Sequence, residues 1–265
     1  MPRMSDFIKS PETYKHTIMV VGETGCGKTR FASTYPDSYF IFTEPDSHQT
    51  ILTAGNQDNV YFFDYAIPSD ETDLKLYDKS IEGHITQAKA LYKEGKVKSL
   101  VIDNFTYLAH NYWLQIEQFE KVYSKAGNVD TLKMYGTLKD KLYKLVLMKI
   151  LTFPGNIVLT VHEQMESDEI MEKKPDKSDP VVPQIMGGFR SEIGGLFSAV
   201  LYLMVALKDN QYIYYAITNK MQQRRGKTRF DLPSIIKSPT YSTITDAIKS
   251  SINKRQISQP VTQEA

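Results

Sequence analysis

The chain has 265 residues, of which 41% are hydrophobic and 24% are charged, and its formal net charge is +1. This composition supports one sizeable core, and the near-neutral charge excludes a global basic excess without excluding a local basic patch for nucleic acid. A single cysteine rules out an internal disulfide, and the lack of a signal peptide or of an apolar run of 18 residues predicts a cytoplasmic protein without a membrane span.

Strands and helices alternate along the first two thirds of the chain. Residues 1–15 form a polar lead-in, and the acidic segment 66–78 and the charged, Pro-containing segment 164–184 are expected to be loops. Short apolar runs predict strands at 17–21, 38–43, 60–63, 97–103, 156–161, 199–205 and 211–217. Helices are predicted at 29–34, 81–94, 105–123, 132–151, 192–198 and 244–252.

The order of these elements predicts an α/β fold. Alternation of strands and helices up to residue 161 is typical of a mostly parallel central sheet flanked by helices. The last two strands are expected to form an antiparallel hairpin at the edge of that sheet. No strong domain boundary is visible, so we expect a lead-in at 1–13, one domain over 14–235, and a C-terminal helix with a polar tail over 236–265.

Residues 16–31 carry the most specific motif in the chain. Gly22-x-x-x-x-Gly27-Lys28-Thr29 is a complete phosphate-loop pattern between a predicted strand and a predicted helix. Its backbone N–H groups and the helix N-terminus attract phosphate, the lysine reaches the β- and γ-phosphates, and the threonine hydroxyl binds Mg²⁺. The expected cofactors are therefore ATP and Mg²⁺. The predicted nucleotide-binding residues are Gly22, Glu23, Thr24, Gly25, Cys26, Gly27, Lys28, Thr29 and Arg30, with Cys26 read as a variable loop position.

Three acidic residues follow predicted strands. Asp103 ends the run Leu100-Val-Ile and is predicted to hold Mg²⁺ together with Thr29, the alternative being a helix cap, since Asp103 and Asn104 precede a predicted helix. Hydrolysis also needs a base that orients water, and Glu44, after the second strand, is the first candidate. Glu163 is the second candidate, and a solvated loop carboxylate is the alternative reading of Glu44.

Polar residues also end the strand at 156–161. His162 or Gln164 could sense the γ-phosphate there and pass its presence to the following loop; the alternative for His162 is a satisfied, partly buried histidine.

A basic stretch occupies residues 220–229 and contains no acidic residue. Phosphate-backbone contacts, a cation donated to a neighbouring subunit's ATP, or a solvated basic face would each explain it. Its basic residues are Lys220, Arg224, Arg225, Lys227 and Arg229.

These features together resemble the RecA-like P-loop ATPases, and more closely the short phage ATPases described as AAA-domain nucleotide-binding proteins, some of which anneal single-stranded DNA. The resemblance covers roughly residues 14–232 and is carried by the phosphate loop, Glu44, Asp103 and His162-Glu-Gln164. It implies a RecA-like fold, Glu44 as catalytic base, Gln164 or His162 as γ-phosphate sensor, and a loop at about 165–186 that faces single-stranded DNA.

The resemblance also implies a function and partners. It predicts an ATPase that acts on single-stranded DNA in phage-type recombination, annealing or replication, in the cytoplasm of a bacterium or phage-infected host. A homo-oligomer on DNA or nucleotide is expected, with a single-strand-binding or replication protein as a candidate partner. In filament-forming members lysines reach the next subunit's ATP, and Thr218-Asn219-Lys220 matches that place in part. The alternatives are a small-molecule kinase, or a nucleotide-dependent switch or assembly factor that binds no DNA.

Overall fold

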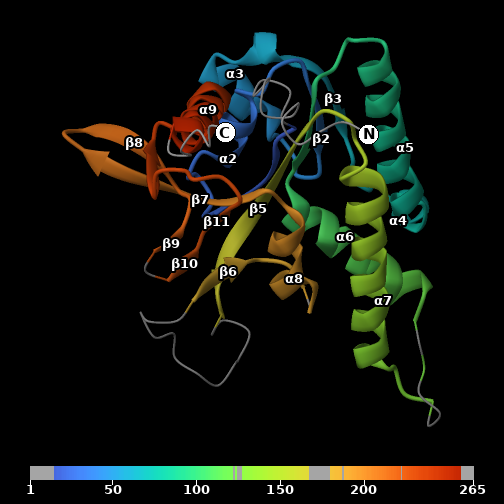
Figure 1. Cartoon of the computed structure of the whole chain (residues 1–265). Helices are drawn as coiled ribbons and strands as arrows, with labels where there is room; N and C mark the ends of the chain where they lie inside the picture. The colour runs from blue at the N-terminus through green and yellow to red at the C-terminus, as the bar shows by residue number, and fades with distance from the viewer. Residues whose placement is uncertain are drawn as a thin grey trace, which may run out of the picture.

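The computed structural model describes residues 15–121, 123, 127–166, 180–186, 188–221 and 223–257. The predicted lead-in at 1–13, the central part of the predicted loop at 164–184 and the end of the polar tail lie outside these residues. The described chain folds into a twisted sheet with helices on both faces (Figure 1).

The central sheet has the strand order β12-β8-β7-β1-β5-β4-β2-β3. At one edge, β8 (Gln211–Ile217) and β12 (Ile235–Lys237) run antiparallel to their neighbours. This arrangement confirms the predicted α/β fold with a mostly parallel sheet and an antiparallel edge hairpin. The parallel strands are β1 (Thr17–Gly22), β2 (Ser38–Phe42), β3 (Val60–Tyr65), β4 (Ser99–Asp103), β5 (Asn156–Met165) and β7 (Ala199–Lys208).

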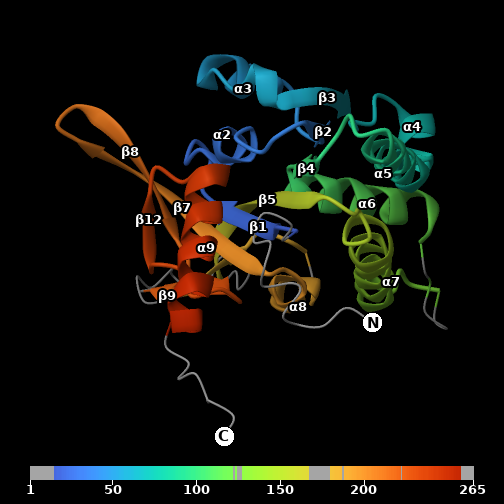
Figure 2. The ribbon, with the colours of Figure 1, turned by 45° about the horizontal axis from the view of Figure 1, so that its top comes forward.

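Side chains on successive strand residues alternate between two cores. Met19 and Ile102 belong to the core that α5, α6, α7 and α8 cover, whereas Val20 and Val101 belong to the core under α2, α3 and α9 (Figure 2). Burial on both faces explains why these strands read as continuous apolar runs. The helices are α2 (Lys28–Ala32), α3 (His48–Ala54), α4 (Glu71–Lys75), α5 (Tyr77–Lys93), α6 (Phe105–Phe119), α7 (Thr131–Lys144), α8 (Phe189–Leu196) and α9 (Tyr241–Ile257), with the single turn η2 (Gln57–Asn59) before β3.

A small second sheet continues from the carboxyl end of β5. It contains β6 (Val181–Pro183), β10 (Arg224–Arg225) and β9 (Lys220–Met221), so the basic stretch lies beside the end of β5. A further short strand, β11 (Lys227–Thr228), pairs with β7. The sequence shows the charge of residues 220–229 but does not predict these strands, because a strand of two residues is too short to give an alternating pattern.

Other elements also differ from the predictions. The segment predicted as a loop at 66–78 contains α4, which Asp70 caps by accepting a hydrogen bond from the Asp73 N–H. The long helix predicted at 132–151 is α7 followed by a π-helical segment, η3 (Leu145–Ile150). At the C-terminal side, β12 spans the expected boundary between residues 235 and 236, and Ile244 and Ile248 of α9 are buried in the core under α2.

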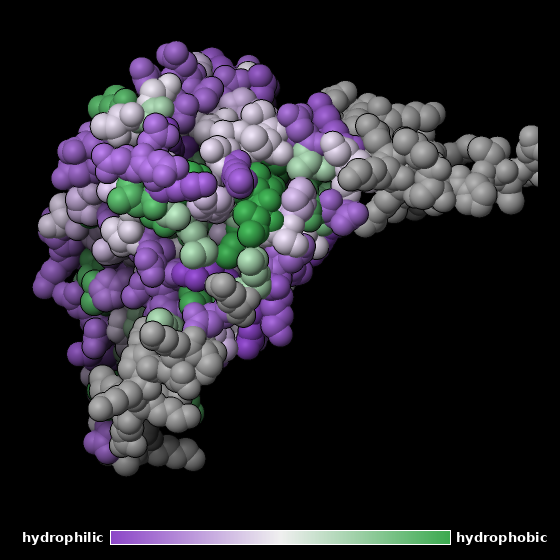
Figure 3. Space-filling model, turned by 90° about the vertical axis from the view of Figure 1, so that its left-hand side faces the viewer, coloured by the Kyte–Doolittle hydropathy of each residue, from purple (hydrophilic) through white to green (hydrophobic). Residues whose placement is uncertain are grey.

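The β7–β8 hairpin projects from the body of the molecule (Figure 1, Figure 2). Beyond the core its side chains are exposed, and Leu207 and Tyr212 are 63% and 70% accessible. Figure 3 faces this side of the molecule and shows hydrophobic residues among a mainly hydrophilic surface. In the part of the chain that the structure describes, no helix is both long enough and apolar enough to cross a membrane.

Candidate functional site

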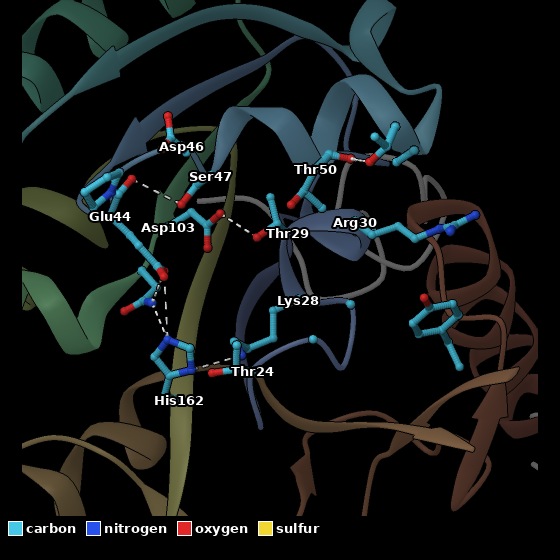
Figure 4. Close-up of a pocket in the computed structure, with 17 residues that line it drawn as sticks. Thr24, Lys28, Thr29, Arg30, Glu44, Asp46, Ser47, Thr50, Asp103 and His162 are labelled. Carbon is cyan, nitrogen blue, oxygen red and sulfur yellow. Dashed lines mark hydrogen bonds and ion pairs between the residues drawn. The ribbon is translucent and has the colours of Figure 1, made fainter. Parts of the chain in front are cut away.

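A cavity of about 370 Å³ lies where β1, β2, β4 and β5 end (Figure 4). Parallel strands bring the residues at their carboxyl ends to one edge, which is the usual ligand-binding side of such sheets. The strand β5 lies between β1 and β4, so His162 comes between the phosphate loop and Asp103. The lining residues are Thr24, Gly25, Gly27, Lys28, Thr29, Arg30, Glu44, Pro45, Asp46, Ser47, Thr50, Thr53, Ala54, Asp103, Asn104, His162 and Tyr214.

The phosphate loop has the backbone shape that its glycines predict. Gly25 and Gly27 have φ angles of 82° and 90°, in the left-handed region that favours glycine. A Cβ at Gly22 would lie 2.7 Å from the Leu203 carbonyl oxygen of β7 and would also meet the Cys26 sulfur, so that position also requires glycine. Burial raises the pKa of the Cys26 thiol, which makes it a packing residue of the loop and not a reactive thiolate.

Lys28 lies across this loop without an acidic partner among the contacts described. Its Nζ donates to the Gly22 and Glu23 carbonyl oxygens, at 2.9 and 2.8 Å, and lies 3.2 Å from His162 Nδ1. Carbonyl oxygens hold the ammonium group in place but leave its positive charge uncompensated. The charge is therefore available to an anion in the cavity.

Asp103 and Thr29, which the sequence predicts to hold Mg²⁺, are hydrogen-bonded to each other. The Thr29 hydroxyl donates to Asp103 Oδ2 at 2.7 Å, and the Thr160 hydroxyl donates to Oδ1. Burial raises the pKa of Asp103, and the two hydroxyl donors and Lys28 oppose that rise. A hydroxyl beside a carboxylate, both at the floor of a phosphate-sized cavity, is an all-oxygen donor set that suits Mg²⁺.

Asn104 has a place in the cavity that the sequence did not predict, since there it was considered only as a possible helix cap. Its Oδ1 accepts from the Tyr107 N–H at 3.1 Å, so Asn104, and not Asp103, caps α6. Its Nδ2 donates to Glu44 Oε2 at 3.0 Å and lies 2.8 Å from His162 Nε2. One side chain thus ties the start of α6 to two residues of the cavity. Only its place after a strand-ending aspartate could have drawn attention to it.

Glu44 lies in this cavity as an ionised carboxylate. His162 is the main influence that holds the pKa of Glu44 below its usual value, and the charge of Lys28 and the Asn104 amide act in the same direction, against the effect of burial. His162 lies between the two charges: its Nδ1 faces the Lys28 ammonium group at 3.2 Å, and its Nε2 faces Glu44 Oε2 at 3.9 Å. This arrangement provides a negatively charged acceptor next to the phosphate loop.

The other sequence-predicted residues lie elsewhere. Glu163 is paired with Arg224, whose Nη2 and Nε donate to its two oxygens at 2.5 and 3.2 Å, and the Glu163 side chain is 4% exposed. Gln164 lines a neighbouring cavity that also includes His162. Neither Glu163 nor Gln164 is among the described residues that line the cavity at the phosphate loop.

The basic stretch divides into two groups. Lys227 Nζ lies 3.4 Å from the Gly194 and Gly195 carbonyl oxygens, and Arg229 donates to Gly195 at 3.3 Å, so both neutralise the C-terminal end of α8. The side chains of Lys220 and Arg225 are exposed on β9 and β10. These two are the cations of the stretch best placed for an external ligand.

Tyr214 of β8 is a second residue that the sequence did not single out. Its ring packs against Gly27, where an added Cβ would lie 2.8 Å from it, and the Arg30 guanidinium lies 5.3 Å from the ring centroid. The ring and guanidinium thus form one wall of the cavity beside the first turn of α2.

Comparison with known proteins agrees with this geometry. A family model described as an AAA domain matches residues 14–230. Among solved structures, a KaiC-like protein from the hyperthermophilic archaeon Pyrococcus horikoshii OT3 is 17% identical over 84% of this chain and 89% of that chain, with a TM-score of 0.43. No curated protein matches the sequence significantly. The chain belongs to the AAA-domain family and is a P-loop ATPase.

Proposed function

We propose that this cavity hydrolyses Mg²⁺-ATP with Glu44 as the base that activates water. The observation that carries the proposal is the convergence of Lys28, Asp103 and Glu44 at one edge of the sheet. The loop and Lys28 would bind the phosphates. Thr29 and Asp103 would hold Mg²⁺, which neutralises charge on the phosphate oxygens when it is bound.

Glu44 has the properties that this role requires. Its lowered pKa keeps it ionised at neutral pH, so it can accept the proton of a water molecule that attacks the γ-phosphate. The products of that step are ADP and inorganic phosphate. His162 lies between Lys28 and Glu44, which favours it over Gln164 as the residue that senses the γ-phosphate.

Substitution of Glu44 tests the assignment. Glu44→Gln keeps the size of the side chain but removes the proton acceptor, so we expect ATP binding to persist and turnover to fall by at least about 100-fold. Lys28→Ala should weaken nucleotide binding itself. The matched comparison is Glu163→Gln, with folding checked by thermal unfolding. Loss of turnover in a folded Glu163→Gln protein, with normal turnover in Glu44→Gln, would transfer the role to Glu163.

We further propose that single-stranded DNA is the polymer on which this ATPase acts, as a homo-oligomer in recombination, annealing or replication of the phage type. The exposed Lys220 and Arg225 support this, because their sheet continues directly from β5, the strand that carries His162. ATP turnover should rise when single-stranded DNA is added, and the mass measured by light scattering should increase with nucleotide and DNA. Turnover that ignores every nucleic acid would favour a switch or assembly factor, and phosphoryl transfer to a metabolite would favour a kinase.

A further inference from the structure

A second cavity, of about 330 Å³, lies on the other side of His162 from the phosphate loop. We call it the His162 side cavity. It is bounded by the first turns of α6, by the end of β5 and by the residues that follow β6. Its lining residues are Thr106, Tyr107, His110, His162, Gln164, Gln184, Ile185 and Met186.

Backbone hydrogen bonds hold the walls of this cavity together at His162. The Gln184 N–H donates to the His162 carbonyl oxygen at 2.7 Å. The His162 N–H donates to the Thr106 hydroxyl oxygen at 3.0 Å. Three segments far apart in the sequence are therefore fixed to one residue, and the cavity is part of the folded protein and needs no ligand to form it.

The lining has the chemistry of a site for a flat heterocycle. The Tyr107 ring is 40% exposed and stands edge-on to the His162 ring, with centroids 6.0 Å apart and planes at 78°. Ile185, 2% exposed, provides an apolar floor, and Gln184 provides an amide that can both donate and accept. No lysine or arginine is among the described lining residues, so the cavity suits a base better than a phosphate.

We propose that the His162 side cavity binds one nucleobase of a single-stranded nucleic acid, stacked on Tyr107. Aromatic rings stack on bases of any sequence, and glutamine amides bond to their polar edges. This inference rests on the proposed action on single-stranded DNA and adds where a base is held. The exposed Lys220 and Arg225 serve the phosphates, at the sheet that continues from the same strand.

A base in this cavity acts on the hydrolytic residues through two short connections. The first is His162 itself, which contacts Lys28 through Nδ1 and faces Glu44 with Nε2. The second runs from the Tyr107 N–H to Asn104, whose amide donates to Glu44. Tyr107 is thus a positioning residue for the hydrolytic step. Occupation of the cavity changes the rate of hydrolysis, whereas phosphate contacts alone change only affinity for the strand.

The test compares two single strands of equal length at one salt concentration, oligo-dT and an abasic strand that keeps the sugar-phosphate chain but has no bases. Strand binding is followed by fluorescence anisotropy and ATP turnover is measured at saturating strand. We expect both strands to bind, with the abasic strand about tenfold weaker because stacking is lost, and only oligo-dT to stimulate turnover. In Tyr107→Ala, oligo-dT should no longer raise ATP turnover above the unstimulated rate. Tyr107→Phe keeps the ring, so its stimulation should match that of the wild type.

Tyr61→Ala is the matched control, because Tyr61 is an exposed tyrosine on β3 at the far edge of the sheet. Equal stimulation by the two saturating strands would overturn the inference. A folded Tyr107→Ala protein that oligo-dT stimulates as strongly as the wild type would overturn it too. Stimulation that needs Tyr107 but not the bases would also overturn it, since the cavity would then hold sugar or backbone. If neither strand binds nor stimulates, the proposed action on DNA fails, which is a different result from failure of the cavity alone.

Discussion

The charges at the site are held by neutral groups, and this is what keeps them available. Lys28 is bound by two carbonyl oxygens, Asp103 by two hydroxyl groups, and Glu44 by the Asn104 amide and the His162 ring. A direct ion pair between Lys28 and either carboxylate would neutralise the charges that are needed to bind phosphate or a metal ion. Glu163 and Arg224 form such a direct ion pair nearby. Their charges neutralise each other and hold β10 beside the end of β5.

His16 allows a prediction of how stability depends on pH. It is 2% exposed, its ring lies among those of Tyr35 and Tyr241, and burial lowers its pKa from 6.5 to about 4. The unfolded chain therefore binds a proton between pH 6.5 and 4 that the folded chain does not, so stability falls as the pH drops through this window and falls no further below it. The expected loss from this group is about 3 kcal/mol.

Urea unfolding at pH 7 and pH 4.5 measures this loss. Because other groups titrate in the same range, the informative quantity is the difference between the wild type and His16→Gln, which cannot take up the proton. The free energy of unfolding of His16→Gln should change less over this interval. Parallel changes in the two proteins would show that His16 is not the cause.

At the scale of elements, the start of α6 links fold and activity through Asn104. Asn104→Asp keeps an oxygen that can accept from the Tyr107 N–H, so the helix cap is preserved. It replaces the amide that donates to Glu44 by a second carboxylate, which raises the pKa of Glu44. We expect a lower unfolding temperature, because the new carboxylate is buried beside Glu44, and an acidic limb of the kcat–pH profile that moves to higher pH.

Asn104→Ala separates the two roles. It removes the helix cap as well as the amide that donates to Glu44. We therefore expect the free energy of unfolding to fall by about 1 kcal/mol and kcat to fall as well. Thermal unfolding and kcat measured over pH for both variants decide the matter. Acidic limbs of wild type and Asn104→Asp that superimpose would mean that Asn104 does not act on Glu44.

The elements also explain which parts of the site the sequence could predict. The phosphate loop is contiguous, so its residues and backbone shape follow from a pattern of eight positions. Asp103 ends β4, Glu44 follows β2, and His162 lies in β5 opposite Gly22 at the end of β1, so alternation of strands and helices is enough to bring them to one edge. Asn104 is different, since its partners are 60 and 58 residues away and no spacing encodes them. The short helices α3 and α4 were missed because neither carries a strong apolar period.

Across the whole molecule, a net charge of +1 means that the proposed affinity for DNA would have to come from a local group of cations. The basic stretch contains five basic residues in the sequence. The fold shows that Arg224 pairs with Glu163 and that Lys227 and Arg229 neutralise the end of α8. Lys220 and Arg225 are exposed and have no such contact among those described, so they are the two cations that the proposed strand would use. Such a division cannot be inferred from composition, because it depends on which carboxylates and helix ends lie opposite.

This division predicts a change in salt dependence. Each phosphate contact to a single strand adds about 0.7 to the slope of log affinity against log salt, so Lys220→Gln with Arg225→Gln should reduce the slope by about 1.4. The matched control is Lys79→Gln with Lys93→Gln, which changes the net charge equally but on the helix α5 and not on the small sheet beside β5. Anisotropy titrations with oligo-dT over a salt series measure both slopes. If the control lowers the slope as much as the test pair, total charge attracts the strand and the sheet beside β5 has no special part in binding it. If neither pair changes the slope, the phosphates are held by other residues, and the place of the strand beside His162 has to be sought anew.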